Sequence, residues 1–234
     1  MKVEILFPDL CYLYGDKGNI RYLKECMKDA EFIETSLNEM PAFVNEDVSL
    51  IYMCSMTEKG QERAIERLLK YKERIQELIN KGVCFLLTGN SFEIFNKYIE
   101  DENGRKIEGL GILNYYSKRY IPKRFNSLFL GEFEDFEIVG YTSRFSHTYG
   151  ESDDNYLFKV TKGLGINEQS KYEGIRVNNL FASYLLGPLL IQNPKFTKYI
   201  LNTIKSNEKL AFEKEIMNAY EIRLKELKSD IEFN

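Results

Sequence analysis

Residues 83–96, VCFLLTGNSFEIFN, constrain the fold more than any other stretch of this chain. Residues 83–87 are short and wholly apolar, which is typical of a parallel strand covered on both faces. Residues 88–91 then bring Thr, Gly, Asn and Ser, which favour tight turns and helix caps. Apolar residues return at helical spacing at Phe92, Ile94, Phe95 and Tyr98. The predicted strand, sharp turn and helix place a ligand crevice at the carboxyl end of a strand, as in an open α/β sheet. A nucleophile elbow is built in the same way, but this turn carries Gly and Asn where the attacking Ser or Cys is expected.

The segments before this stretch alternate between strand and helix patterns. Strands are expected at residues 3–7, 31–37 and 48–54, and helices at residues 20–30 and about 57–80. The longer helix has one apolar stripe, and its run of charged residues fits a solvated face. Such alternation builds a mostly parallel sheet with helices on both faces, joined by right-handed crossovers. We therefore predict an α/β fold.

Residues 14–19, YGDKGN, form a Gly-rich turn before the first helix. One reading is a phosphate-binding loop, but the spacing matches neither G-x-G-x-x-G nor the Walker pattern. The other reading, which we prefer, is a helix start capped by Asn19.

The second half of the chain predicts short strands followed by helices. Strands of a meander are expected at residues 125–133, 137–141, 155–161 and 174–177. A further apolar run at residues 180–185 ends in Leu-Gly-Pro, a second candidate crevice loop, and helices are expected at residues 194–204 and 208–227. Because no repeat or linker divides the chain, we predict one domain over residues 1–204 with residues 205–234 as its C-terminal helical extension. That extension packs on its own domain by default, and a partner is the alternative.

Charge and hydropathy exclude several classes of protein. The net charge is −4 and the basic residues are dispersed, so no nucleic-acid footprint is present. No apolar run approaches the roughly 20 residues needed to span a bilayer, so membrane insertion is not expected. The N-terminal stretch MKVEILFPDL lacks the features of a signal peptide. A cytoplasmic location is therefore predicted.

The cysteines and the one histidine restrict the chemistry. Cys11, Cys26, Cys54 and Cys84 show no C-x-x-C spacing and no nearby histidines. Reduced and mostly buried thiols are therefore expected rather than a zinc site, and neither a metal nor a cofactor is indicated. His147 is the only histidine, so any Cys-His or Ser-His pair would have to use it.

Several stretches in register resemble one family. Residues 7–10 and 13–20, FPDL and LYGDKGNI, look like the opening signature of the CobB/CobQ-like class I glutamine amidotransferases. Residues 109–113, GLGIL, are similar to the segment that follows the family's elbow, and residues 183–190, SYLLGPLL, resemble its Thr-Tyr-Leu-His-Gly-Pro-Leu-Leu signature. Order and spacing hold from about residue 3 to residue 204, and the chain most resembles the branch of GatD subunits of lipid II isoglutaminyl synthase. The resemblance implies a flavodoxin-like class I glutamine amidotransferase fold.

Two substitutions stand where the family carries its chemistry. The family's elbow reads Cys-Gly-Gly-Tyr-Gln or Cys-Ala-Gly-Phe-Gln, and its alignment on residues 92–95 puts Gly89 at the nucleophile and Glu93 at the Gln. A slip of one residue would put Thr88 there, which is no thiol either. Leu186 stands at the catalytic His. In the family a thiolate attacks the glutamine amide and the imidazole handles its proton. Gly89 has no attacking atom and Leu186 cannot carry a proton, so we predict a catalytically degenerate homologue.

An active glutaminase with relocated catalytic groups is the first alternative. Cys84 lies inside an apolar strand and is expected to be buried and inert. Cys54 lies near the family's oxyanion loop, where side chains in place of glycines are expected to crowd the donors. Ser91 with His147 is a further pair, but GNSFE is not G-x-S-x-G. The family also places an arginine where His147 aligns.

Substrate-binding side chains are assigned through the resemblance. Arg124 lies about where GatD-like proteins place the arginine that holds the glutamine carboxylate, and a guanidinium fork suits a carboxylate. A surface arginine in a basic loop is an equal alternative, and Arg119 is a competitor for the role. Asn90 and Ser55 complete the expected substrate-binding set.

Three functional hypotheses follow. The first is a non-hydrolysing binding or regulatory subunit for a Mur-ligase-like partner in lipid II amidation, because the family implies a heterodimer in cell-wall peptidoglycan synthesis. The second is the active glutaminase with relocated groups. The third is a sensor that binds glutamine or a similar small molecule in the old substrate pocket.

Overall fold

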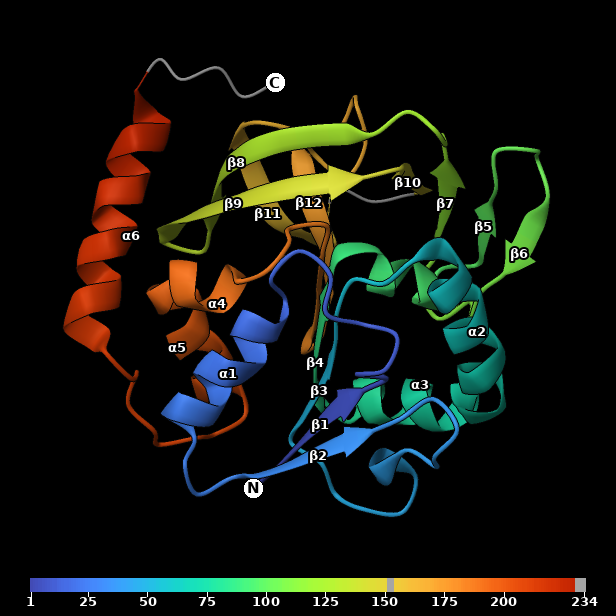
Figure 1. Ribbon diagram of the computed structural model, residues 1–234, viewed down its shortest axis with the longest axis horizontal. Helices are drawn as coiled ribbons and strands as arrows, with labels where there is room; N and C mark the ends of the chain where they lie inside the picture. Colours follow the sequence, from blue (N-terminus) through green and yellow to red (C-terminus); the bar gives the residue numbers. More distant parts are fainter. Residues whose placement is uncertain (151–153, 230–234) are drawn as a thin grey trace.

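The computed structural model describes residues 1–150 and 154–229, and the larger sheet in this part of the chain has nine strands. Their order is β2-β1-β3-β4-β13-β12-β11-β8-β9 (Figure 1). Neighbours are parallel from β2 to β13 and antiparallel from β13 to β9. The parallel strands are β1 (Lys2–Leu6), β2 (Glu31–Thr35), β3 (Leu50–Met53), β4 (Cys84–Thr88) and β13 (Leu180–Ser183). The others are β8 (Phe125–Phe133), β9 (Phe136–Arg144), β11 (Tyr156–Lys162) and β12 (Tyr172–Val177).

Helices cover both faces of the parallel part. On one face lie α1 (Lys17–Cys26), α4 (Leu189–Gln192) and α5 (Pro194–Thr203), and on the other lie α2 (Glu58–Leu68) and α3 (Lys72–Asn80) (Figure 1). Successive side chains of β4 point to opposite faces, so Phe85 and Leu87 join the α2–α3 core while Cys84 and Leu86 join the α1–α5 core. The wholly apolar run at residues 83–87 is therefore explained by burial on both sides.

A second sheet has four strands. Its strands, in the order β10-β7-β5-β6, are β10 (Ser146–Gly150), β7 (Tyr115–Arg119), β5 (Tyr98–Glu100) and β6 (Lys106–Glu108).

We predicted an α-helix after the turn at residues 88–91, but the structure has the 3₁₀ helix η3 (Gly89–Phe95) there. The carbonyls of Ile94, Phe95 and Asn96 accept backbone hydrogen bonds from residues 110–113, and an α-helix would need these acceptors for itself. The segment at residues 109–113 thus pairs with the carbonyl groups at the end of η3.

Two helix boundaries differ from the prediction. Helix α1 begins at Lys17 with Asp16 at its N-cap, so the predicted cap at Asn19 was wrong. Asn19 is buried and binds the Tyr52 hydroxyl (2.9 Å) and the Leu190 backbone N–H (2.9 Å) instead. The long helix expected at residues 57–80 is interrupted by the 3₁₀ turn η2 (Leu69–Tyr71).

Two peripheral helices complete the described part. The short 3₁₀ helix η1 (Ala42–Val44) follows β2, and α6 (Glu213–Lys228) lies beside the β8–β9 hairpin (Figure 1). Residues 230–234 of the expected extension lie outside the described residues. Within residues 1–150 and 154–229, no helix has both the length and the apolar character needed to cross a membrane.

Candidate functional site

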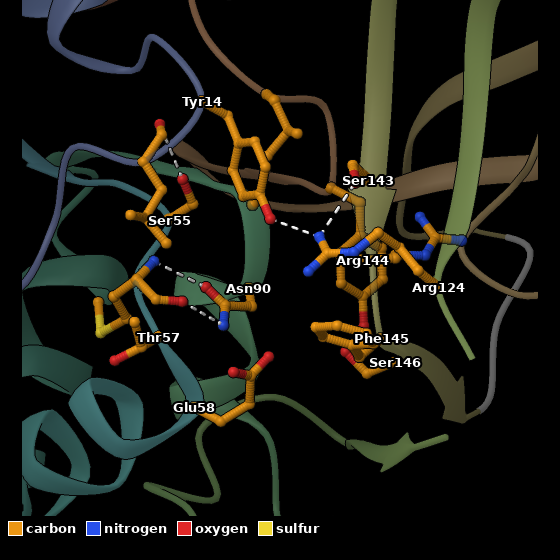
Figure 2. A pocket seen from close by; sticks show the side chains of 15 residues that line it. Tyr14, Ser55, Thr57, Glu58, Asn90, Arg124, Ser143, Arg144, Phe145 and Ser146 are labelled. Carbon is orange, nitrogen blue, oxygen red and sulfur yellow. Dashed lines mark hydrogen bonds between the residues drawn. The ribbon is translucent and has the colours of Figure 1, made fainter. Parts of the chain in front are cut away.

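The carboxyl ends of β3, β4 and β13 meet at one pocket. Its walls come from five parts of the chain, the loops after β1, β3, β4 and β13 and the β8–β9 region, and its volume is about 130 Å³. Figure 2 shows the side chains that line it. All the predicted site residues line this pocket: Gly89, Leu186, Arg124, Asn90 and Ser55. The structure therefore brings together residues as far apart in the chain as Ser55 and Leu186.

Gly89 occupies the apex of the turn in a left-handed conformation, with φ +63°. Glycine adopts this conformation without steric cost, whereas side chains disfavour it. A Cβ built on Gly89 would lie 2.5 Å from the Cβ of Ser55 and 3.3 Å from a methyl carbon of Leu186. The space into which a nucleophile would project is already occupied.

Ser55 is fixed in this place by a buried carboxylate. Asp16 accepts hydrogen bonds from the Ser55 hydroxyl, the Ser55 backbone N–H (2.9 Å), the Gly187 N–H (2.8 Å) and the Thr88 hydroxyl (3.2 Å). Burial raises the pKa of Asp16, and the four donors oppose that shift. Sequence reasoning missed Asp16 as a site residue; its position inside the opening signature was the available signal.

Two backbone N–H groups in the loop after β3, those of Ser55 and Met56, are also hydrogen-bonded within the protein. The Met56 N–H donates to the side-chain oxygen of Asn90 (3.0 Å), and the Asn90 amide donates back to the Met56 carbonyl (2.9 Å). Because the Ser55 N–H is bound to Asp16, neither N–H points freely at the pocket. An oxyanion hole needs such donors to be aimed at the reacting oxygen, and here these two are already paired.

Leu186 gives the pocket an apolar wall at the position that the resemblance assigns to the base. Its side chain is buried, and its backbone N–H donates to the Tyr141 carbonyl (2.9 Å) on β9. An isobutyl group neither accepts nor delivers a proton.

Arg124 lies at the rim with its guanidinium held in one orientation. One terminal nitrogen donates to the Tyr14 hydroxyl and to the Ser143 hydroxyl (3.2 Å), and the group lies 3.9 Å above the ring of Phe145 (Figure 2). Arg119 is arranged differently. It is buried in an ion pair with Glu62 (2.9 Å) and lines a separate surface groove, so of these two candidates Arg124 is the one that lines this pocket, where the buried Arg144 is a second arginine.

None of the alternative nucleophiles has a suitable environment. Cys54 and Cys84 are buried, and burial raises the pKa of both thiols well above the ordinary value. The Ser91 hydroxyl donates to the carbonyls of Met53 and Thr88, whereas His147 packs 4.0 Å from the ring of Phe125. Ser91 and His147 thus have separate partners.

Glu93 lies beneath the pocket in a buried polar cluster. It accepts from the Gln61 amide (2.8 Å), the Tyr184 hydroxyl (2.7 Å) and the Ser146 hydroxyl, and burial raises its pKa. Since all three partners donate, this carboxylate ties η3 to α2, to the second sheet and to the segment after β13. Tyr184 and Ser146 line the pocket as well and were not predicted.

Comparisons with known proteins agree with this architecture. Residues 2–194 match the model of the CobB/CobQ-like glutamine amidotransferase domain. The GatD subunit of lipid II isoglutaminyl synthase (glutamine-hydrolyzing) from Staphylococcus aureus (strain N315) is 29% identical over 225 residues, covering 95% of this chain and 92% of that protein. The GatD subunit from Streptococcus pneumoniae (strain ATCC BAA-255 / R6) is 27% identical over 208 residues, covering 87% and 80%.

Solved structures show the same fold at low identity. A glutamine amidotransferase from Thermotoga maritima superposes with a TM-score of 0.53 at 12% identity, covering 97% of this chain and 93% of that one. Another glutamine amidotransferase gives a TM-score of 0.52 at 13% identity, covering 86% and 98%. The predicted α/β fold of the class I amidotransferases is confirmed.

Proposed function

The chain belongs to the family of CobB/CobQ-like glutamine amidotransferases, and we propose that it no longer hydrolyses glutamine. In this proposal it is a binding or regulatory subunit for a Mur-ligase-like partner in the amidation of lipid II for cell-wall peptidoglycan. The similarity to two GatD subunits over most of the chain supports the pathway and the partner class.

One observation carries the proposal that hydrolysis is lost. A Cβ at position 89 would lie 2.5 Å from the Ser55 Cβ, closer than real carbon atoms approach. The substitution of the nucleophile is therefore matched by a second residue that fills its space. Two further features support the loss of hydrolysis: Leu186 stands at the position of the base, and the N–H groups of Ser55 and Met56 are already paired. Changes at the nucleophile, the base and the oxyanion loop all point in the same direction.

The proposal is tested by two measurements on the purified protein. Ammonia release from glutamine is expected to stay at the uncatalysed rate, because there is neither a thiolate at the elbow nor a base beside it. A tagged protein purified from native lysate is expected to bring down a chain whose sequence identifies it as a Mur-ligase homologue. Glutaminase activity that is lost in Cys54→Ala or Cys84→Ala would instead identify a relocated thiol, and the proposal would be wrong.

A second candidate function is small-molecule binding in the same pocket, and Arg124 is the observation that favours it. Its Nε and second terminal nitrogen make no hydrogen bond within the described ranges. A planar guanidinium with one free edge suits a carboxylate. This candidate corresponds to a sensor that has kept the pocket and lost the chemistry.

A further inference from the structure

We infer that Cys11 and Cys54 form a redox-active pair, which a peroxide converts into a disulfide that joins two walls of the pocket. Cys11 lies in the loop after β1, and Cys54 directly follows β3. Both loops continue into residues that line the pocket, Tyr14 after the first cysteine and Ser55 after the second (Figure 2). This modification site does not depend on whether the protein hydrolyses glutamine, because it needs no group at the elbow.

The side chain of Cys11 is directed at Cys54. The Cys11 Sγ donates a hydrogen bond to the Cys54 carbonyl oxygen at 3.3 Å, and it lies 3.7 Å from the carbonyl oxygen of Leu6. The Cys54 sulfur in turn interacts with the Cys11 thiol and with the Tyr12 backbone N–H. Contact between two thiols is the starting geometry for a disulfide, whose S–S bond is about 2.05 Å long. The fold thus pairs two cysteines whose spacing in the sequence shows no redox motif.

The two cysteines differ in their access to solvent, and this difference sets the order of reaction. Cys11 is half-buried, whereas Cys54 and the two remaining cysteines, Cys26 and Cys84, are buried. Burial also raises the pKa of the Cys54 thiol well above its ordinary value, and the neighbouring Cys11 adds to that shift. Oxidation of a thiol follows its thiolate character and its exposure. Cys11 is therefore the thiol that meets the peroxide, and Cys54 is the thiol that resolves the product.

The oxidation has two steps. The Cys11 sulfur attacks one oxygen of hydrogen peroxide, the O–O bond breaks, and the other oxygen leaves as water with the thiol proton, which gives a sulfenic acid. The Cys54 sulfur then attacks the Cys11 sulfur, the S–O bond breaks, and hydroxide leaves as water with the Cys54 proton. Two thiols lose two electrons to one peroxide, and two waters form. A dithiol such as dithiothreitol returns the two electrons and restores both thiols.

The disulfide acts on a loop that tertiary contacts already hold. Phe7, Tyr12 and Tyr14 have positive φ, at 55°, 78° and 54°, although none of them is glycine. Such conformations persist where the surrounding structure fixes them, and here the loop ends at Asp16, which is hydrogen-bonded to Ser55. A covalent bond from Cys11 to Cys54 adds a second link between the same two loops. Local opening of residues 9–15 is therefore reduced in the oxidised protein.

The first test treats the folded, full-length protein with a few equivalents of hydrogen peroxide and maps its cysteines by mass spectrometry. Two of the four thiols are expected to be lost. A peptide pair linked through Cys11 and Cys54 is expected to appear and to disappear again with dithiothreitol. Cys26 and Cys84 are expected to stay reduced, because they are buried. Four free thiols after the treatment, or a mixture of pairings, would overturn the inference.

Three variants assign the roles of the two thiols. Cys54→Ala is expected to leave Cys11 as a sulfenic acid, which dimedone traps, because the resolving thiol is gone. Cys11→Ala is expected to keep the other cysteines reduced. Cys84→Ala is the matched control, since it also removes a buried cysteine and is expected to cross-link at the wild-type rate. Circular dichroism shows that each variant is folded. Oxidation of Cys54 in Cys11→Ala as fast as in the wild type would contradict the assigned order.

Hydrogen exchange measures the effect on the pocket wall. The amides of residues 9–15 are expected to exchange about tenfold more slowly in the oxidised than in the reduced protein, whereas those of α6 are expected to be unchanged. Equal exchange of the loop in both forms would show that the disulfide does not fix the wall, and that part of the inference would be wrong. Ammonia release and co-purification test the proposed function separately.

Discussion

Gly89 is confined to glycine by two independent constraints at the scale of a single residue. Its φ of +63° disfavours any side chain, and Ser55 leaves no room for one. Gly104 separates these effects, because it has φ +81° and a Cβ added to it would meet nothing within 4 Å. We expect Gly104→Ala to cost about 1–2 kcal/mol of unfolding free energy, the cost of the left-handed conformation.

Gly89→Ala is expected to cost more, about 2–4 kcal/mol, because the clash with Ser55 adds an overpacking term. Chemical denaturation of both variants measures the difference between these losses. In the double variant Ser55→Gly with Gly89→Ala the added term is expected to disappear. Equal losses for the two single variants would contradict the view that Ser55 fills the nucleophile's space.

His147 gives the second prediction at this scale, because it is buried and is the only imidazole in the chain. Burial and, to a smaller extent, the charge of Arg144 lower the pKa of His147 to about 4, although Glu168 opposes the shift. Since the folded protein binds the proton less well than the unfolded chain, His147 contributes stability that is fully present above the unfolded pKa of about 6.5 and is lost as the pH falls toward 4.

The imidazole NMR signals of the wild type are expected to titrate near pH 4, with no assignment problem because there is one histidine. The loss of unfolding free energy between pH 6.5 and 4 due to this residue is expected to be about 2–3 kcal/mol. The variant His147→Gln should lack this part of the pH dependence. A titration midpoint near 6.5 would show that the ring is accessible to water.

At the scale of elements, α6 is the segment whose place in the domain is least fixed by the sequence. It is held to β9 by a hydrogen bond from the Tyr220 hydroxyl to the Glu137 carbonyl (2.9 Å) and by an ion pair between Lys228 and Glu137 (2.6 Å). Leu227 is fully buried, whereas Ile222 on the same helix is 54% exposed. We propose that the extension is an integral part of the single domain.

Truncation of these two side chains tests that proposal. Leu227→Ala is expected to cost about 2–4 kcal/mol of unfolding free energy, because it leaves a cavity against β8 and β9, and Ile222→Ala about 0.5 kcal/mol or less. Both values come from chemical denaturation followed by far-UV circular dichroism. Similarly small losses for both variants would mean that α6 is not part of the cooperative unit.

Elements with a strong local pattern could be predicted from the sequence, and those defined by distant partners could not. Strand β4 could be predicted from its apolar run, because a strand that is buried on both faces carries mostly apolar residues. The 3₁₀ helix η3 was missed because its carbonyl partners come from residues 110–113, which no local pattern reveals. Asn19 looked like a cap from its neighbours, but its side chain serves Tyr52 and Leu190.

The same distinction holds for the site. Gly89 and Leu186 were visible as departures from a familiar motif. Two roles could not be predicted: Ser55 fills the space at the elbow, and Asp16 fixes Ser55. Both depend on distances between loops that are far apart in the chain, 39 residues for Asp16 and Ser55.

At the scale of the whole molecule, the proposed loss of hydrolysis and the retention of the fold are compatible, because they depend on largely different residues. The two cores and the nine-stranded sheet are built mostly from apolar side chains that do not line the pocket. Under the proposed function, a surface that binds a partner can therefore persist although the elbow carries no nucleophile. If the protein acts as a non-hydrolysing subunit, the nitrogen for amidation has to reach the partner without it.

The last prediction concerns that source of nitrogen. The reconstituted complex with its Mur-ligase-like partner is expected to amidate lipid II with an ammonium salt and not with glutamine, because a closed elbow cannot form the thioester that releases ammonia. Mass spectrometry of the lipid II product with ¹⁵N-labelled glutamine or ¹⁵N-labelled ammonium measures the source directly. The complex is the right sample, since a partner can order a site that is incomplete in the free subunit. Label transferred from the glutamine amide would contradict the proposal, and its loss in Cys54→Ala or Cys84→Ala would show which thiol had taken over.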